Sequence, residues 1–170
     1  MNDKIEQKQL LVLVTTALMT SIVIVTTLVT KIDMPYGYIN LGDLVIMIIT
    51  CIAPFKIAII AAGLGSALAD LLAGYPIFIL FTLFIKMAEV LVLHLILKTI
   101  KDKRFVFIPF FAAGLTMVLL YGVANVIIAG DINIFPVAVL GDLPQGLTSA
   151  LLATILYPTY IRMKKYLRGT

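Results

Sequence analysis

The sequence has 170 residues, of which 62% are hydrophobic and 13% are charged, and its formal net charge is +4. A water-soluble domain of this size needs far more polar surface, so this composition excludes a soluble globular protein and predicts that membrane lipids surround most of the chain. The basic residues lie at the ends of apolar runs and no nucleic-acid-binding motif is present, so we expect no nucleic-acid partner.

Six apolar runs follow one another along the chain. A bilayer core needs about 20 apolar residues per helix, and unpaired backbone groups are costly in lipid, so each run is expected to be helical. The runs are Leu10–Thr30, Leu41–Ala53, Ile57–Ala73, Ile77–Leu97, Phe105–Ala129 and Leu143–Ile161. The second is short and stops before Pro54, which cannot continue a helix. We therefore predict an all-α polytopic membrane protein, with six transmembrane helices in a compact bundle and a single domain over residues 1–170.

The distribution of positive charge predicts the orientation. With six spans, eleven of the 13 Lys and Arg residues fall on one side; Lys31 lies opposite and Lys86 lies within a span. Because cytoplasmic loops are rich in Lys and Arg, both termini are expected in the cytoplasm. Residues 1–9 are polar and no small-residue cleavage site follows them, so the first run is expected to stay as a span.

The outer side then carries three connecting segments, 31–40, 74–76 and 130–141. The first, KIDMPYGYIN, is rich in turn formers and contains Tyr36, Tyr38 and Asn40. It is too long for a minimal connector, so it is a candidate lid over the bundle. A plain solvated loop is equally compatible with the sequence.

Two charged residues interrupt the fourth run. Lys86 and Glu89 are three residues apart, so they share a helix face and can pair. Charges at this depth cost several kcal/mol each and usually mark a site or pathway. A role in ligand binding and a purely structural ion pair both remain open.

Further polar residues occur at a similar depth in the last two runs. Tyr121 and Asn125 are four apart, and Asp142 and Gln145 stand at the start of the sixth run. An interhelical hydrogen bond is the alternative for Asn125, and an N-cap is the alternative for Asp142, with Pro144 in the first turn. Together these residues predict a pocket that opens to the outside and is closed below by apolar helices.

Small residues form stripes in two runs. In the third run they recur every four positions, at Ala61, Gly65 and Ala69, and this stripe is expected to pack internally. In the first run, Ala17 and Ser21 form a shorter stripe that another membrane protein could contact. No spacing typical of a metal site is visible, so we expect no metal and no cofactor.

Several segments resemble one family, the S components of energy-coupling factor (ECF) vitamin transporters, and most closely the riboflavin-type subgroup. The resemblance rests on YINLGDLVIMI, on the GLGSALADL run of the third span, and on the K-x-x-E of Lys86 and Glu89. It covers residues 39–97 well and the remainder by topology. Family members usually carry A-x-x-x-A in the first span; here Ser21 replaces the second alanine.

This resemblance implies a substrate-binding subunit of an ECF-type ABC importer in the cell membrane. It implies that a vitamin or precursor, of the hydroxymethylpyrimidine, pyridoxine or riboflavin class, binds on the outer side under the first loop. It also implies assembly with a coupling transmembrane subunit, through the helix of Ala17 and Ser21, and with two ATPase subunits that use the ATP. The chain itself is then no enzyme.

Two other readings remain. Gly65-Ser66 is similar to a serine-nucleophile turn, but Leu64 and Ala67 replace the flanking glycines of rhomboid-like proteases. The alternative of another class is a self-sufficient small-solute channel or secondary transporter.

Overall fold

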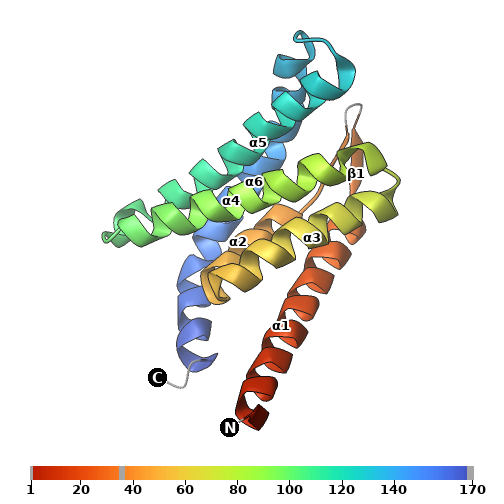
Figure 1. Ribbon diagram of the computed structural model, residues 1–170. Helices are drawn as coiled ribbons and strands as arrows, with labels where there is room; N and C mark the ends of the chain where they lie inside the picture. The colour runs from red at the N-terminus through yellow and green to blue at the C-terminus, as the bar shows by residue number, and fades with distance from the viewer. Residues whose placement is uncertain (1, 35–36, 168–170) are drawn as a thin grey trace.

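The structure, a computed structural model, describes residues 2–34 and 37–167. In chain order the elements are α1 (Asn2–Val29), β1 (Ile32–Met34), β2 (Gly37–Ile39), α2 (Gly42–Ile52), α3 (Phe55–Ala73), α4 (Ile79–Thr99), α5 (Phe107–Ala129) and α6 (Ile134–Leu167) (Figure 1). Short 3-10 turns, Pro76–Phe78 and Lys103–Phe105, precede α4 and α5. The prediction of a helical bundle with six helices is confirmed for the described part of the chain.

The helices are not all long enough to cross a bilayer. Five of the six in the described chain have the length and apolar composition of a membrane span, whereas α2 has 11 residues. Eleven residues extend about 16 Å along a helix axis, against a hydrocarbon core of about 30 Å. The structure therefore supports a polytopic protein with five full-length spans and one short inner helix, and six complete spans are not shown.

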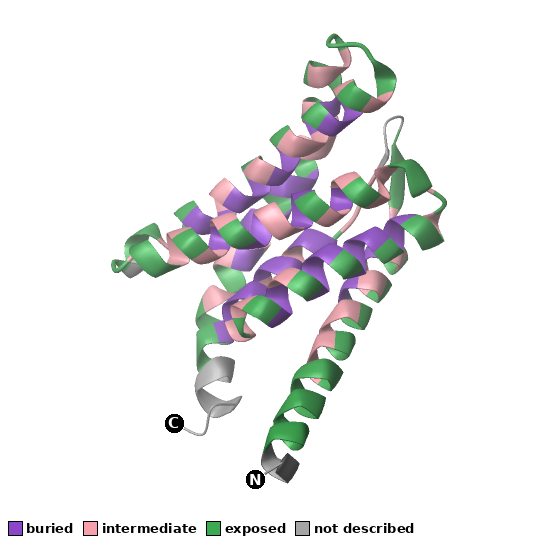
Figure 2. Ribbon diagram, viewed as in Figure 1, coloured by how far each residue is buried: buried purple, intermediate pink, exposed green. Residues whose placement is uncertain are grey.

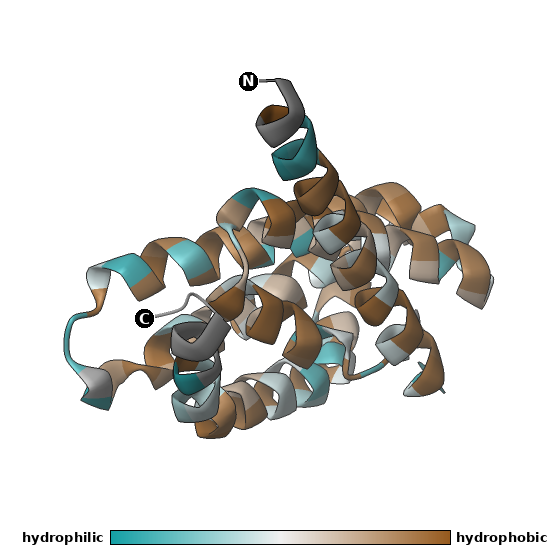
Figure 3. Cartoon of the chain, turned by 90° about the horizontal axis from the view of Figure 1, so that it is seen from below, coloured by the Kyte–Doolittle hydropathy of each residue, from teal (hydrophilic) through white to brown (hydrophobic). Residues whose placement is uncertain are grey.

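The short helix α2 lies inside the bundle. It contacts α1, α3, α4 and α6, and it buries residues on several sides, including Asp43, Ile46, Met47 and Thr50. Buried residues face inward and exposed ones face outward on the surrounding helices (Figure 2), most helical residues are hydrophobic (Figure 3), and many large hydrophobic side chains are exposed. An apolar exterior of this kind suits a chain whose solvent is lipid.

Small residues allow the helices to approach closely. A Cβ atom at Gly65 of α3 would lie 2.8 Å from Cβ of Val23 in α1, and one at Gly114 of α5 would lie 2.7 Å from the carbonyl oxygen of Gly146 in α6. Ala61 and Ala69 are fully buried. The predicted internal packing of the small-residue stripe in α3 is confirmed.

The first outer segment is a β-hairpin rather than a loop. β1 and β2 pair antiparallel, with Ile32 opposite Ile39 and Met34 opposite Gly37. The backbone hydrogen bonds between the two strands satisfy N–H and C=O groups that would otherwise need water as a partner. The sequence left a lid and a plain solvated loop as alternatives for 31–40, and neither alternative included the paired strands that the described residues of this segment form.

The third outer segment is also shorter than expected. Gly130 ends α5 with a positive φ of 70°, and α6 begins at Ile134, so most of the predicted loop 130–141 is helical. Asp142 therefore lies inside α6 and is not its N-cap, and Pro144 lies in the helix interior rather than in the first turn. The apolar residues 134–140 extend α6 toward the outer side. The predicted start at Leu143 gave Pro144 too much weight as a sign of the first helical turn.

The ends of the bundle are distinct. The start of α1 and the end of α6 lie at one end, whereas the hairpin, the α3–α4 turn and the α5–α6 turn lie at the other (Figure 1). This arrangement is the one that the charge pattern requires. The assignment of the two termini to the cytoplasm stays a prediction.

The contact between α5 and α6 generates a stability prediction. Gly114→Ala is expected to lower the free energy of unfolding by about 1–3 kcal/mol, because the new methyl group meets the backbone of Gly146, which cannot move aside cheaply. Gly141→Ala is the control: nothing lies within 4 Å of its Cβ position, so a helical alanine should be neutral or stabilising by about 0.5–1 kcal/mol. Unfolding in detergent micelles measures both, and equal effects would contradict the packing.

Candidate functional site

A buried ionic cluster connects three helices. Asp43, in the first turn of α2, accepts a hydrogen bond from Nζ of Lys86 in α4 through one oxygen and from Nε2 of Gln145 in α6, at 2.5 Å, through the other. Nζ of Lys86 also lies 3.3 Å from Oε2 of Glu89. All four side chains are buried, so the ammonium group exchanges its hydration shell for two carboxylates.

The same cluster holds the end of the hairpin. The amide group of Gln145 accepts a hydrogen bond from the backbone N–H of Asn40 at 2.6 Å, and the side chain of Asn40 accepts one from the N–H of Gly42 at 2.6 Å. The N–H of Leu41 donates to Oγ1 of Thr30 at 2.9 Å. The segment between β2 and α2 is therefore fixed by Thr30, just after α1, and by Gln145 of α6, as well as by its own turn.

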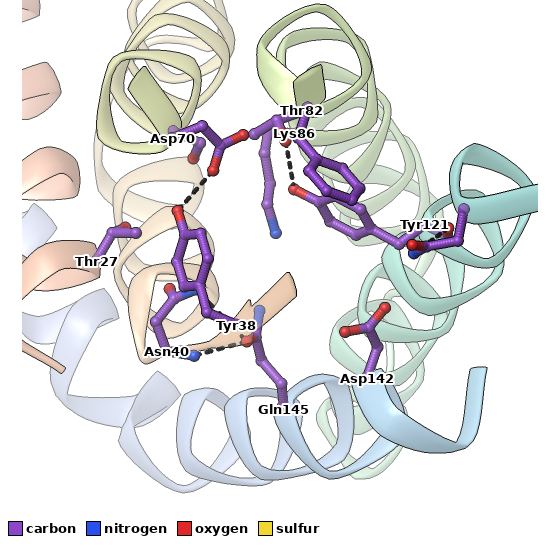
Figure 4. A pocket seen from close by; sticks show the side chains of 12 residues that line it. Thr27, Tyr38, Asn40, Asp70, Thr82, Lys86, Tyr121, Asp142 and Gln145 are labelled. Atoms are coloured by element: carbon purple, nitrogen blue, oxygen red, sulfur yellow. Dashed lines mark hydrogen bonds between the residues drawn. The ribbon is translucent and has the colours of Figure 1, made fainter. Parts of the chain in front are cut away.

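A cavity lies between this cluster and the hairpin (Figure 4). The empty space between its lining atoms, together with the part that is open to solvent, is about 490 Å³. Its walls come from α1, β2, α3, α4, α5 and α6, together with Asn40 and the 3-10 turn before α4. The lining residues are Thr27, Tyr38, Asn40, Ser66, Asp70, Phe78, Thr82, Lys86, Tyr121, Asn125, Asp142 and Gln145. Its mixture of aromatic and polar groups is that of a small-molecule site.

Hydrogen bonds connect the hairpin to α3 and to the α3–α4 turn. The Tyr38 hydroxyl donates to Oδ1 of Asp70 at 2.6 Å (Figure 4), and the Tyr75 hydroxyl donates to Oδ1 of Asp33 at 2.9 Å. Nζ of Lys31 lies 2.8 Å from the same Asp33 oxygen, and the rings of Tyr38 and Tyr75 are 5.1 Å apart. The hairpin thus closes over one side of the cavity.

Two of these hairpin groups have shifted pKa values. The hydrogen bonds from Lys31 and then Tyr75 hold the pKa of Asp33 below its ordinary value. Burial, reinforced by the nearby Asp70 carboxylate, raises the pKa of the Tyr38 hydroxyl. Tyr38 therefore remains a hydrogen-bond donor throughout the physiological pH range.

The opposite wall is built by α4 and α5. The hydroxyl groups of Thr82 and Tyr121 are 2.9 Å apart, and Nδ2 of Asn125 donates to the carbonyl oxygen of Tyr121 at 3.0 Å. Nζ of Lys86 lies 5.3 Å from the centre of the Tyr121 ring, within range of a cation–π contact. Phe78 adds an apolar ring to the lining.

The structure brings together most of the residues that the sequence singled out. The cavity is lined by Tyr38, Asn40, Lys86, Tyr121, Asn125, Asp142 and Gln145. Glu89 is paired with Lys86 as predicted, but it is absent from the cavity wall. Tyr36 lies outside the described residues. Ala17 and Ser21 are exposed elsewhere, in a groove between α1 and α3.

The sequence reasoning missed several residues of the site. Asp43 is the most important of these, and Thr27, Ser66, Asp70 and Thr82 also belong to it. Thr82 is one helical turn from Lys86, and Ser66 is one turn from Asp70. Helical spacing from a charged residue could therefore have identified both hydroxyl residues as part of the site. Asp43 stands at a helix start, where an acidic residue has an ordinary role opposite the helix dipole.

Comparisons with known proteins agree with this architecture. The family model described as "ECF-type riboflavin transporter, S component" matches residues 7–162. An "Uncharacterized protein in gap 3'region" of Pyrococcus woesei is 37% identical over 101 residues, which cover 58% of this chain and 68% of that protein. The family match includes the hairpin and every residue that lines the cavity.

The ionic cluster generates a second prediction. Lys86→Met is expected to lower the free energy of unfolding by about 3–5 kcal/mol, because Asp43 and Glu89 remain buried without their cation. The triple variant with Asp43→Asn and Glu89→Gln should recover most of that loss. Lys98→Met, at the exposed end of α4, is the matched control and should change stability by less than about 0.5 kcal/mol. Equal losses in the single and triple variants would show that charge compensation is not the cause.

Proposed function

Because the chain belongs to the S-component family of ECF-type riboflavin transporters, which are transporter subunits and not enzymes, we propose that it is the membrane-embedded substrate-binding subunit of an ATP-driven importer. Its ligand is a water-soluble vitamin or precursor of the hydroxymethylpyrimidine, pyridoxine or riboflavin class. It captures this ligand from outside, beneath the hairpin, with both termini in the cytoplasm.

The observation that carries the proposal is a polar cavity at the hairpin end with an apolar layer beneath it. Beyond the ionic cluster, the described core is mostly apolar, with Met47, Leu93, Phe110 and Ala153 packed together and the buried hydroxyl groups of Thr50 and Ser149 as exceptions. An open channel needs a continuous path for water across the membrane, so a cavity closed in this way favours a receptor. This argument supports the binding subunit over the self-sufficient channel or transporter.

The lining favours a small heteroaromatic ligand. Tyr38, Phe78 and Tyr121 offer ring faces, and Asn40, Asn125 and Thr82 offer groups that bond hydroxyl and ring-nitrogen atoms. Hydroxymethylpyrimidine, pyridoxine and riboflavin all combine a flat ring with hydroxyl groups. The chemistry of the walls therefore supports this class as a whole.

The partners follow from the same family assignment. We propose a coupling transmembrane subunit and two ATPase subunits, which bind and hydrolyse the ATP. The groove between α1 and α3 is suited to the coupling subunit, since Ala17 and Ser21 leave it open between exposed apolar residues such as Leu13 and Leu64. Small residues at such a surface let a partner helix approach closely.

A binding measurement tests the proposed site. Asn125→Ala is expected to weaken binding of the cognate vitamin about tenfold, because the amide group is buried at the cavity wall and a polar ligand atom would lose its partner. Asn133→Ala, on the exposed α5–α6 turn, is the control. Calorimetry on the purified chain with riboflavin, hydroxymethylpyrimidine and pyridoxine gives the affinities. Normal binding by Asn125→Ala would place the site elsewhere, and sustained uptake by liposomes containing this chain alone would favour the channel.

An assembly measurement tests the proposed partner surface. Replacing Ala17 or Ser21 with Leu is expected to reduce copurification with the coupling subunit at least about tenfold, since added bulk prevents close helix packing. Vitamin binding should remain normal, because neither residue lines the cavity. Ile22→Phe adds bulk at an exposed position of α1 outside the groove and should assemble normally. Full assembly by both groove variants would exclude this surface.

A further inference from the structure

The cavity has an excess of acidic groups. Around it and in the ionic cluster stand four carboxyl groups, from Asp43, Asp70, Glu89 and Asp142, against the single ammonium group of Lys86. Among the residues that the structure describes, no arginine or second lysine lines it. In surroundings of low dielectric constant, an excess of negative charge attracts a cationic ligand, and repels an anionic one, more strongly than it would in water.

The charge of Lys86 is already compensated. Nζ of Lys86 bonds to both Asp43 and Glu89, and these two carboxylates have no other cation among the described residues. Of these three residues, only the lysine contributes to the lining. Lys86 can still offer a hydrogen bond to a ligand, but it does not make the cavity attractive to an anion.

The other two carboxyl groups have no ion-pair partner among the described residues. Asp70 is 3% exposed, and while its Oδ1 accepts the Tyr38 hydroxyl, its Oδ2 is buried without a hydrogen-bond partner among the described residues. Asp142 is half-buried, and no hydrogen bond or ion pair to it occurs in the described structure. The two side chains face the cavity from opposite walls, α3 and α6 (Figure 4). A buried carboxylate without a partner is costly, and a bound ligand is the natural source of the missing donors.

We propose that the site selects a ligand carrying a positively charged nitrogen, which pairs with Asp142 while its ring lies between Tyr121 and Tyr38 and a second donor reaches Asp70. This inference rests on the proposed function and narrows it to a cationic, amine-bearing heteroaromatic compound. Aromatic rings at the walls add cation–π attraction to the ion pair. Anionic vitamins and phosphorylated precursors meet two like charges and bind poorly.

A matched ligand series tests the proposal on the wild-type chain. Pyridoxamine, pyridoxine and 4-pyridoxate share one ring and differ at one substituent, which is an ammonium, a hydroxyl and a carboxylate group. Pyridoxamine is expected to bind about tenfold or more tightly than pyridoxine, since charge-assisted hydrogen bonds are roughly twice as strong as neutral ones. 4-Pyridoxate should bind about tenfold or more weakly than pyridoxine. Calorimetry in nanodiscs, with hydroxymethylpyrimidine and riboflavin as further neutral probes, gives the ranking.

A pair of variants assigns the preference to its residue. Asp142→Asn keeps the size and a hydrogen-bonding oxygen but removes the charge, so the ratio of the pyridoxamine and pyridoxine affinities should fall about tenfold, towards one. Asp131→Asn makes the same change on the exposed α5–α6 turn and should leave the ratio as it is. An unchanged ratio in folded Asp142→Asn protein would overturn the role of Asp142.

The results separate this inference from the proposed function. Tighter binding of riboflavin, hydroxymethylpyrimidine, pyridoxine or 4-pyridoxate than of pyridoxamine overturns the preference for a cation and leaves the vitamin-binding function standing. Failure of every probe to bind the folded chain contradicts the proposed function itself. Binding in the order pyridoxamine, pyridoxine, 4-pyridoxate supports both.

Discussion

The carboxylate of Asp43 connects the short helix α2 to α4 and α6. A lysine at membrane depth is tolerated only when its charge is paired, and Asp43 provides that pairing for Lys86 while its second oxygen holds Gln145. Because the two partners come from α4 and α6, the short helix α2 is fixed between them without having to cross the bilayer. Removal of any one member would leave buried polar atoms unsatisfied, so the cluster specifies how these helices are arranged.

The cavity follows from this arrangement. The ionic cluster forms the floor of the cavity. Because Gln145 also accepts a hydrogen bond from the backbone N–H of Asn40, the cluster fixes the position of the hairpin above that floor. The bond from Tyr38 to Asp70 then closes one wall. Below the cluster the helices meet through apolar and small residues, as at Gly114, and this lower half contributes packing rather than chemistry. Binding near one surface and rigidity near the other suit a subunit that captures a solute and leaves the work of transport to its partners.

The sequence predicted the groupings of residues that follow from helical periodicity. The pairing of Lys86 with Glu89 follows from three-residue spacing, and both Tyr121 and Asn125 reach the cavity from one helix face. Helical spacing could not predict contacts between distant segments: Asp43 lies 43 residues from Lys86 and 102 from Gln145. An acidic residue at a helix start is also explained by the helix dipole alone, so nothing indicated that Asp43 belongs to a buried cluster. The length of α6 was underestimated for a local reason, since a proline in a membrane helix can be tolerated where neighbouring helices satisfy the backbone. The two short strands of the hairpin were not predicted, because turn-forming residues are frequent in this segment.

Native mass spectrometry of the freshly purified chain, offered riboflavin, hydroxymethylpyrimidine, pyridoxine and pyridoxamine together, tests the central claim most directly. The account predicts one small heteroaromatic molecule bound per chain, with the amine-bearing member of the mixture preferred, and its loss when the ionic cluster is dismantled by Asp43→Asn. A folded chain that carries only lipid under these conditions would contradict the claim that the cavity beneath the hairpin is a ligand site.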